Sequence, residues 1–360
     1  LTLNYRLAND IDASGTSQWT NGSGTVIGFT PIGGNATHGL PYAGTFDGQG
    51  HTISGLFINL PGASQVGLFG NLSGTVEKLS LTGVNITGGT TVGSIAGSNS
   101  GTINDVRASG SVAGQNYVGG LVGQNYDSDN PSPTVLPVIT RSMANVSVLA
   151  GTGAQSVGGL VGNNEGTISL AYATGSVTAG GGGTGGLIGT NGNGSVSQSY
   201  ATGAVDGGTG STAVGGLIGL NFAPVSASFW DVTSTGQGQG IGSDSTGSAA
   251  PTGLTTAQFQ SAGSFVPLAA AQGWSFEADW APPAAGFYPV LYALAPVVRA
   301  VTDGTARPYG STSAFPLLAS YGGPSSYVFG PSGDSLALTN PFSSAAGATS
   351  GVGTYAVTGL

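Results

Sequence analysis

Residues 157–177 read VGGLVGNNEGTISLAYATGSV, and this stretch decides the fold. It contains three short apolar runs, VGGLVG, GTISL and YATGSV. Each run is bounded by Gly, Asn or Ser, the residue types that make turns between strands. Three short strands in about 27 residues suit one turn of a three-sided coil, with Val and Ile alternating toward its inside.

The opening phrase of this stretch recurs six times, as VGLFG, VGSIAG, VGGLVG twice, TGGLIG and VGGLIG. The copies begin at Val66, Val92, Val118, Val157, Thr184 and Val214. Their start-to-start intervals are 26, 26, 39, 27 and 30 residues. A period in this range marks a repeat architecture, in which each unit stacks on its neighbours to bury a shared core. We therefore predict an all-β fold, a right-handed parallel β-helix whose coils lie about 4.8 Å apart.

The 39-residue interval contains an insertion within one coil. The step from Asn99 to Ile103 is 4 residues, whereas the corresponding step from Asn125 to Ile139 is 14. The ten extra residues lie within YDSDNPSPTVLPV, residues 126–138, which is rich in Asp, Asn, Ser and Pro. Such residues favour turns and loops, so we expect this insertion to protrude from the coil.

Five asparagines fall at the same place in successive repeats. They are Asn99, Asn125, Asn164, Asn191 and Asn221. Stacked side-chain amides can hydrogen-bond along the axis of a stacked-strand structure, as Asn ladders do. We predict that these residues form a structural ladder at one corner of the solenoid.

The pattern divides the chain into three parts. Residues 1–231 are assigned to the parallel β-helix, with the repeats over about 66–231. Residues 232–295 are assigned to a linker and a solenoid cap with one short helix, because Thr255 to Gln258 match a helix-capping box and an aromatic segment follows. Such a cap would cover strand edges and core at the open end. Residues 296–360 are assigned to a small separate β-domain.

Composition excludes several classes of partner. The net charge is −9, and the six Lys and Arg residues are scattered, so nucleic acid is not expected to bind. No apolar run of about 20 residues is present, so we expect no membrane insertion of this chain. Cysteine is absent, which leaves neither a disulfide nor a thiol nucleophile.

The GGLVGxN phrases, followed by GTI and YATGSV, resemble the GLUG-motif repeats of filamentous-hemagglutinin-like bacterial exoproteins of two-partner secretion systems. Upstream, NDIDAS, PIGG and GTFDGQGHTISGL look like the segment that commonly precedes such repeats, and SFWDVTSTGQ, GLTTAQF and YPVL look like the one that follows them. RPYGSTSAF and GTYAVTG resemble the tandem β-modules of these adhesins, often called MBG domains. The phrase VGLFG is one residue short, and VGSIAG has Ser94 in place of the second Gly.

This resemblance implies a bacterial adhesin that is secreted or held on the outer cell surface. Its expected role is attachment or biofilm formation, through glycans or other host or bacterial cell-surface molecules. An outer-membrane transporter is implied as a partner by the resemblance alone.

The insertion also carries the candidate ligand site. A sugar site needs an exposed aromatic ring beside polar side chains, since the ring covers an apolar sugar face while the amides fix hydroxyls. The cluster that fits is Asn125, Tyr126, Asp127 and Asp129. Asp127 and Asp129 are also candidates for Ca²⁺, a cation that takes oxygen ligands, although a solvated turn is the alternative. We otherwise expect no metal and no cofactor.

Catalysis is the competing interpretation, because polysaccharide lyases and hydrolases also use β-helices. A glycosidase needs two carboxylates across the scissile bond. The candidates are isolated in the sequence: Asp47, Glu77, Asp105, Glu165, Asp206 and Asp231. We therefore expect a non-enzymatic adhesin fragment. The alternative is a structural spacer of a larger exoprotein, and a β-helix lyase or hydrolase comes third.

Overall fold

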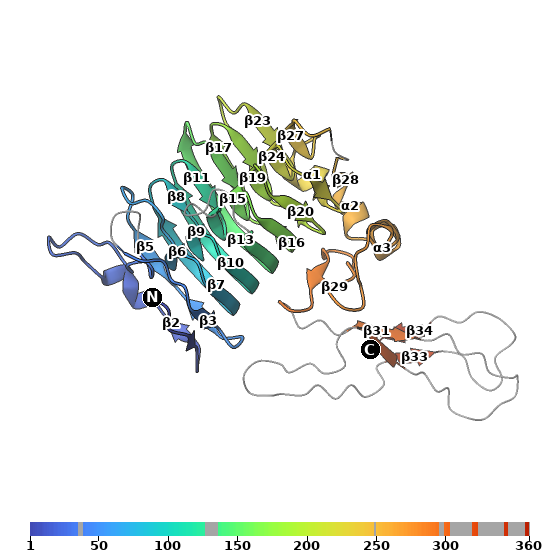
Figure 1. The fold of residues 1–360 in the computed structure, drawn as a ribbon. Coiled ribbons are helices and arrows are strands. Elements are labelled where there is room, and N and C mark those ends of the chain that lie inside the picture. The colour runs from blue at the N-terminus through green and yellow to red at the C-terminus, as the bar shows by residue number, and fades with distance from the viewer. Residues whose placement is uncertain are drawn as a thin grey trace, which may run out of the picture.

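The computed structural model describes residues 1–34, 39–126, 136–247 and 250–294 in full. Beyond residue 294 it describes the backbone of four strands, β31 (Arg299–Thr302), β32 (Ala319–Gly322), β33 (Phe342–Ser344) and β34 (Val357–Gly359), in two antiparallel pairs. The rest of the predicted β-domain lies outside the described residues. The fully described part is a stack of coils that runs from the N-terminal strands at one end to helices at the other (Figure 1).

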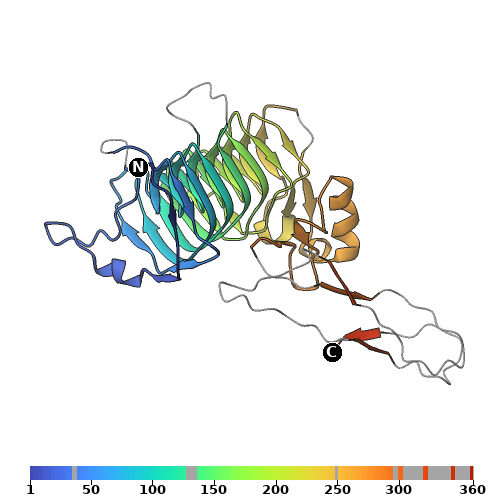
Figure 2. The ribbon, with the colours of Figure 1, turned by 60° about the horizontal axis from the view of Figure 1, so that its bottom comes forward.

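Three parallel sheets form the walls of these coils, and Figure 2 shows the stack along its length. Sheet 1 has five strands: β8 (Thr91–Val92), β11 (Tyr117–Gly119), β14 (Ser156–Gly158), β18 (Gly183–Gly185) and β23 (Ala213–Gly215). Sheet 2 has seven: β6 (Phe69–Leu72), β9 (Ala96–Asn99), β12 (Val122–Asn125), β15 (Val161–Asn164), β19 (Ile188–Asn191), β24 (Ile218–Asn221) and β27 (Ile241–Asp244).

Sheet 3 is the largest wall, with sixteen strands. Its members are β1 (Tyr5–Arg6), β2 (Ile11–Asp12), β3 (Thr45–Asp47), β4 (Thr52–Ser54), β5 (Phe57–Asn59), β7 (Thr75–Thr87), β10 (Thr102–Gly114), β13 (Val138–Thr152), β16 (Thr167–Ala173), β17 (Val177–Gly180), β20 (Ser195–Ser197), β21 (Tyr200–Ala201), β22 (Val205–Asp206), β25 (Val225–Ser226), β26 (Phe229–Asp231) and β28 (Thr252–Leu254). All of their pairings are parallel, which confirms the predicted all-β, parallel β-helix class.

The core lies inside the coils and is built from columns of aliphatic side chains. Strand register places Ile103 opposite Val76 on one side and Ile139 on the other. The same column continues through Ile168, Val196 and Val225, and all six side chains are buried. Each such side chain contributes roughly 1.5–3 kcal/mol by leaving water. The same inward position is therefore filled by Val or Ile in six successive coils.

The paired glycines of the repeated phrase lie at the corner between sheets 1 and 2, in close contact with the next coil. A Cβ atom at Gly120 would overlap the carbonyl oxygen of Gly159 in the next coil, and one at Gly159 would overlap that of Gly186. A side chain at these two positions would have to displace the backbone, because atoms in a folded protein cannot interpenetrate. The coil before Gly120 has the buried Ser94 at the equivalent position, and its hydroxyl donates to the Gly120 carbonyl (2.5 Å). Glycine is therefore required at Gly120 and Gly159, although not in every coil.

A bend recurs in the long strands of sheet 3 and uses residues other than glycine. Lys78, Asp105, Arg141, Leu170, Gln198 and Ala227 all have φ between 41° and 56°, and they occupy equivalent positions in six successive coils. This left-handed conformation is costly for residues with a side chain, so the surrounding ladder must impose it.

Buried serines compensate for the ladder hydrogen bonds interrupted by this bend. Ser142 Oγ accepts a hydrogen bond from the amide of Val106 (3.3 Å) and donates to the carbonyl of Thr140 (2.7 Å). Ser199 and Ser228 repeat the arrangement in later coils. A backbone amide buried without an acceptor would cost about 1–3 kcal/mol, which explains a hydroxyl in an otherwise apolar interior.

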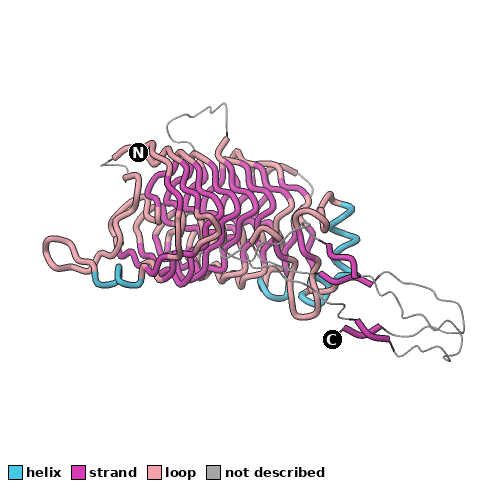
Figure 3. The backbone as a smooth tube through the Cα atoms, turned by 90° about the horizontal axis from the view of Figure 1, so that it is seen from below, coloured by secondary structure: helices cyan, strands magenta, loops and turns pink. Residues whose placement is uncertain are grey.

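The coils continue past residue 231, the predicted end of the solenoid. Strand β27 pairs in parallel with β24, and β28 pairs in parallel with β26, so another partial coil closes the stack. Helices α1 (Val232–Thr235), α2 (Thr256–Phe259) and α3 (Ala262–Ala271) follow the last complete coil, and they gather at the C-terminal end (Figure 3). A short 3-10 helix, η1 (Ser14–Gln18), lies near the other end.

The described residues of the region 232–295 therefore form three helices, where the sequence predicted one. The predicted capping box is present at the start of α2, where Thr255 caps the helix and Gln258 returns a bond to the Thr255 amide. Strands β29 (Trp280–Ala281) and β30 (Val290–Leu291) form a small antiparallel pair beyond the helices. Single-sequence propensity misses α3 because Gly, Pro and Ser interrupt it, so its stability must come from packing of its apolar side.

The aromatic segment covers an outer face of sheet 3 as well as the end of the stack. Tyr172 and Tyr200, neighbours in register, stack with ring centroids 4.8 Å apart and planes 9° apart. Trp274 and Trp280 pack over them, and the Tyr200 hydroxyl donates to the Pro289 carbonyl (2.6 Å). Desolvation raises the pKa of Tyr200 well above its usual value. This tyrosine stripe is buried under the cap, so it is packing and not an open ligand platform.

Candidate functional site

The five repeated asparagines form a continuous chain of hydrogen bonds along the solenoid. Asn99 Nδ2 donates to Asn125 Oδ1 (2.7 Å), and Asn125 Nδ2 donates to Asn164 Oδ1 (2.8 Å). The same bond links Asn164 to Asn191 (2.9 Å) and Asn191 to Asn221 (2.9 Å). All five side chains are fully buried. Asn99 starts the chain, and each later amide accepts from the coil before it and donates to the coil after it.

The chain of amides ends on a carboxylate that the sequence analysis did not identify. Asn221 Nδ2 donates to Asp244 Oδ1 (2.9 Å), and that oxygen also accepts from the Thr246 amide (3.0 Å) and hydroxyl (2.8 Å). The Thr246 amide first, and then the side-chain bonds, lower the pKa of Asp244. A carboxylate only accepts, so it suits the last position of a chain in which every bond runs the same way. The signal for Asp244 was hidden because IGSD does not resemble the repeated phrase.

The insertion leaves and re-enters the coil at this same corner. The Tyr126 amide donates to the Asn99 carbonyl (2.8 Å), and the Val138 amide donates to the Gly101 carbonyl (2.9 Å). Tyr126 is half-buried and Asn125 belongs to the ladder, whereas Asp127 and Asp129 lie outside the described residues. Of the two described members of the predicted ligand cluster, Tyr126 lies at the base of the insertion, whereas the Asn125 side chain is fully buried and bonded within the ladder.

The candidate catalytic carboxylates occupy separate structural roles. Asp105 pairs with Arg141 (2.7 Å), Glu77 lies 4.0 Å from Lys78, and Asp206 accepts from the Gly208 amide (2.8 Å). Asp47 is opposite Glu77 in the register of β3 and β7, on the opening coils. Glu165 accepts from Asn163 and Asn193 at 3.4 Å. Among the residues that the structure describes, no three His, Asp or Glu side chains gather as a metal site.

Asp231 is the most elaborately bonded carboxylate in the described chain. It caps α1 by accepting from the amides of Thr233 (2.8 Å) and Ser234 (3.0 Å), and its second oxygen accepts from Thr256 (2.7 Å) and Tyr288 (2.6 Å). Desolvation raises the pKa of Asp231, but these four hydrogen bonds together outweigh it and lower the pKa below its usual value. The residue therefore joins the last coil to the cap.

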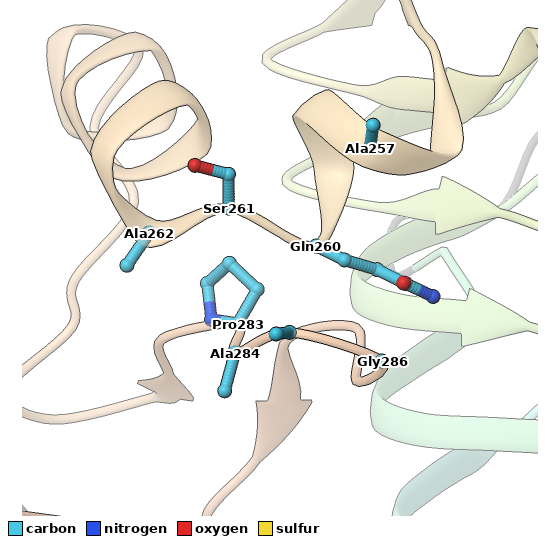
Figure 4. Close-up of a pocket in the computed structure, with 8 residues that line it drawn as sticks. Ala257, Gln260, Ser261, Ala262, Pro283, Ala284 and Gly286 are labelled. Carbon is cyan, nitrogen blue, oxygen red and sulfur yellow. The ribbon is translucent and has the colours of Figure 1, made fainter.

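A shallow pocket lies between the cap helices and the turn before β30 (Figure 4). Its volume is about 600 Å³, and Ala257, Gln260, Ser261, Ala262, Pro283, Ala284, Ala285 and Gly286 line it. Ser261 already accepts from the Ser264 amide at the start of α3 (3.3 Å), which leaves the Gln260 amide as the main polar group. None of the lining side chains titrates, so this pocket offers shape without acid–base chemistry.

No helix among the described residues is long and apolar enough to span a membrane. No family model matches the chain. Over 123 residues it is 46% identical to halomucin of Haloquadratum walsbyi, a match that covers 33% of this chain and 1% of halomucin. A protein of Evansella cellulosilytica, provisionally named a Gly-rich membrane protein, is 32% identical over 138 residues, covering 28% of this chain and 16% of that protein. The chain thus spans a small part of both relatives.

Among solved structures, the chain is similar to one from Bacteroides ovatus that is provisionally named an immunoglobulin A1 protease. The TM-score is 0.59 at 21% identity, over 81% of this chain and 86% of that one. At this identity the likeness concerns the fold alone. It agrees with the stacked parallel sheets, and the architecture of the chain is therefore a parallel β-helix.

Proposed function

We propose that this chain is a non-catalytic adhesive segment of a secreted or outer-surface bacterial protein. In this role the β-helix is a rigid rod, and the 126–138 insertion is the part presented to glycans or other cell-surface molecules. The observation that carries the proposal is the placement of the insertion. The insertion leaves the coil at one corner, and the strands of that coil otherwise remain in register with those of the neighbouring coils.

Strand register shows how little the insertion disturbs the rod. Val138 and Ile139 pair with Thr102 and Ile103 in the preceding coil, although ten more residues separate them from the ladder asparagine. The cost of closing a loop grows only slowly with its length, so ten additional residues cost little stability. A loop that is tolerated in this way is a common place for binding residues.

Two further arguments support the location and the role. The similarity to halomucin is to a protein whose name describes a mucin, and mucins are secreted or surface proteins. The resemblance to GLUG-motif repeats of filamentous-hemagglutinin-like proteins supports adhesion or biofilm formation. On this basis, the export partner is the outer-membrane transporter of a two-partner secretion system.

The register also defines a clean deletion for testing this function. Residues 127–136 are the ten that have no counterpart in the preceding coil, and Pro137 then takes the place of Gly101. The test variant therefore removes 127–136 and changes Pro137→Gly, which recreates the normal corner. Both proteins are applied to an array of glycans and bacterial exopolysaccharides, with and without Ca²⁺.

We expect saturable binding by the full chain and loss of binding by the deletion variant, with an unchanged unfolding transition. Dependence on Ca²⁺ would assign Asp127 and Asp129 to a metal site. Binding that survives the deletion would refute the insertion as the contact. Release of sugar products from any polysaccharide on the array would overturn the non-catalytic role.

A structural spacer is the second candidate, and the asparagine ladder favours it. Buried hydrogen bonds that run along the axis tie each coil to the next, which is what a stalk under tension needs. This function predicts no ligand for the chain. It also predicts, under axial pulling in a single-molecule instrument, a stepwise loss of one coil at a time at the end opposite the cap.

A further inference from the structure

One corner of the solenoid presents the same backbone position in each coil, directly after the ladder asparagine. The amides of Ser100, Tyr126, Glu165, Gly192, Phe222 and Ser245 each donate to a carbonyl in the preceding coil. We call these six residues the corner row. Because the ladder residues point inward and are buried, the residues that follow them face outward.

The middle of the corner row has an aromatic residue at each end and polar groups between them. Phe222 is 54% exposed, and Tyr126, three coils earlier, is half-buried. Glu165 lies one coil after Tyr126 and accepts from Asn193, which is exposed in the following coil (3.4 Å). At about 4.8 Å per coil, the two aromatic positions are ~14 Å apart along the axis.

Gly192 adds no side chain to the surface between these two aromatic residues. A side chain there would press on Glu165, since its Cβ would lie 3.3 Å from Glu165 Cγ. Between Tyr126 and Phe222, the surface therefore carries the Glu165 carboxylate and the neighbouring Asn193 amide. The Glu165 carboxylate and the Asn193 amide bond to each other and not to groups of the core, so both can also bond to a ligand.

We propose that the corner row binds a neutral polysaccharide chain lying along the solenoid axis. Aromatic rings cover the apolar faces of sugar units, and the Glu165 carboxylate and Asn193 amide supply an acceptor and a donor for hydroxyl groups. The span between the rings is one that a few linked sugar units cover. This inference rests on the proposed adhesive function and names its ligand class.

Charge selects neutral over acidic chains. The row contributes Glu165 and no cation, and the described Lys and Arg side chains with assigned contacts lie on sheet 3 with Glu77, Ser80 and Asp105. The net charge of the chain is −9. A uronic-acid polymer would meet repulsion without compensation, because like charges brought together cost free energy.

The experiment uses the full chain and calorimetric titration with hexasaccharides of glucose, mannose and xylose, with oligogalacturonate as the acidic probe. The variants are Phe222→Ala, Tyr126→Ala and Asn193→Ala, and the matched control is Phe287→Ala, an exposed aromatic on the cap. We expect about a tenfold weaker Kd for either aromatic variant, a smaller loss for Asn193→Ala and no change for Phe287→Ala.

Oligomer length provides a second readout that a merely structural effect would not produce. Affinity is expected to rise with chain length until both rings are reached, and Phe222→Ala is expected to remove this rise while leaving the unfolding transition unchanged. Preference for oligogalacturonate, or equal affinity of Phe222→Ala and the parent, overturns the corner row. If binding is lost only in the 127–136 deletion, adhesion stands and the row fails. If no sugar binds to any form, both fail.

Discussion

The asparagine ladder allows a sharp prediction, because its middle and its end have different chemical requirements. Asn164 accepts from Asn125 Nδ2 (2.8 Å) and from the Gly166 amide (3.2 Å). It also donates to Asn191 Oδ1 (2.9 Å) and to the Gly166 carbonyl (3.1 Å). Asn164→Asp keeps the shape and the acceptors but removes both donors. We expect this change to destabilise the protein strongly at neutral pH.

The magnitude follows from these contacts. Two buried acceptors, on Asn191 and Gly166, lose their donors, and each unsatisfied group costs about 1–3 kcal/mol. The new carboxylate is also buried beside those acceptor oxygens without a cation, and leaving a buried charge uncompensated typically costs about 3–5 kcal/mol. The unsatisfied acceptors and the buried charge involve the same oxygen atoms, so the two penalties overlap. We therefore expect the free energy of unfolding to fall by about 3–5 kcal/mol in total.

The pH dependence has a definite sign. Burial beside acceptors raises the pKa of the introduced carboxyl in the folded state above its unfolded value of about 3.9. Between the unfolded pKa and the raised folded pKa, the folded state binds more protons than the unfolded state. The stability of the variant relative to the parent therefore falls as pH rises through this range. Protonation restores one donor. The deficit of Asn164→Asp should therefore be smaller at pH 4.5 than at pH 7.5.

Equilibrium unfolding in guanidinium, followed by far-ultraviolet circular dichroism at both pH values, measures these differences. The matched control is Asp244→Asn at the end of the ladder, where the site only accepts hydrogen bonds. That change should cost about 1 kcal/mol or less, since only charge assistance is lost. An equal cost for the two variants, or a deficit in Asn164→Asp that does not change with pH, would refute a directional ladder.

Three further predictions concern the core and the cap. Thr184 occupies a core column that otherwise holds valine, and its buried hydroxyl has no partner, so Thr184→Val should raise the unfolding free energy by about 1–2 kcal/mol in a guanidinium titration. Gly120→Ala should lower the melting temperature because its Cβ overlaps the next coil, whereas Gly151→Ala, with open space around it, should not. The lowered pKa of Asp231 means that its contribution is complete above about pH 4 and is lost as pH falls through the folded pKa. Cap tryptophan fluorescence should therefore change on acidification in the parent, and Asp231→Asn should remove that change.

Repetition made the solenoid predictable from one chain. A phrase repeated six times identifies inward columns, turn positions and the insertion, because every coil must satisfy the same stacking geometry. The last partial coil escaped detection because its strands, Ile241–Asp244 and Thr252–Leu254, are separated from the repeat pattern by α1 and turn residues. A strand that is held only by its neighbours needs no repeat phrase of its own.

The candidate site was predictable only in part. The ladder asparagines were identified from their spacing, and Tyr126 from its place beside polar residues in the insertion. Phe222 was not identified, since it stands alone in the sequence and gains meaning only from its position three coils beyond Tyr126. Tyr172 and Tyr200 both stand in the phrase YATG of successive repeats, yet only the folded cap shows that they are covered. Whether an aromatic residue is a ligand platform or core depends on what packs over it.

The sequence by itself determined the coil, its period, its tight glycine corners and the asparagine positions, because these are local or nearest-neighbour requirements repeated many times. Only the tertiary structure decided the end of the ladder at Asp244, the recurrent left-handed bend with its serine acceptors, and the folding of the cap onto sheet 3. These features depend on contacts between segments that are distant in the chain and occur once or without a motif. Their energies depend on which polar groups would be buried without a hydrogen-bond partner once the coils have stacked. The sequence of a single repeat does not show this.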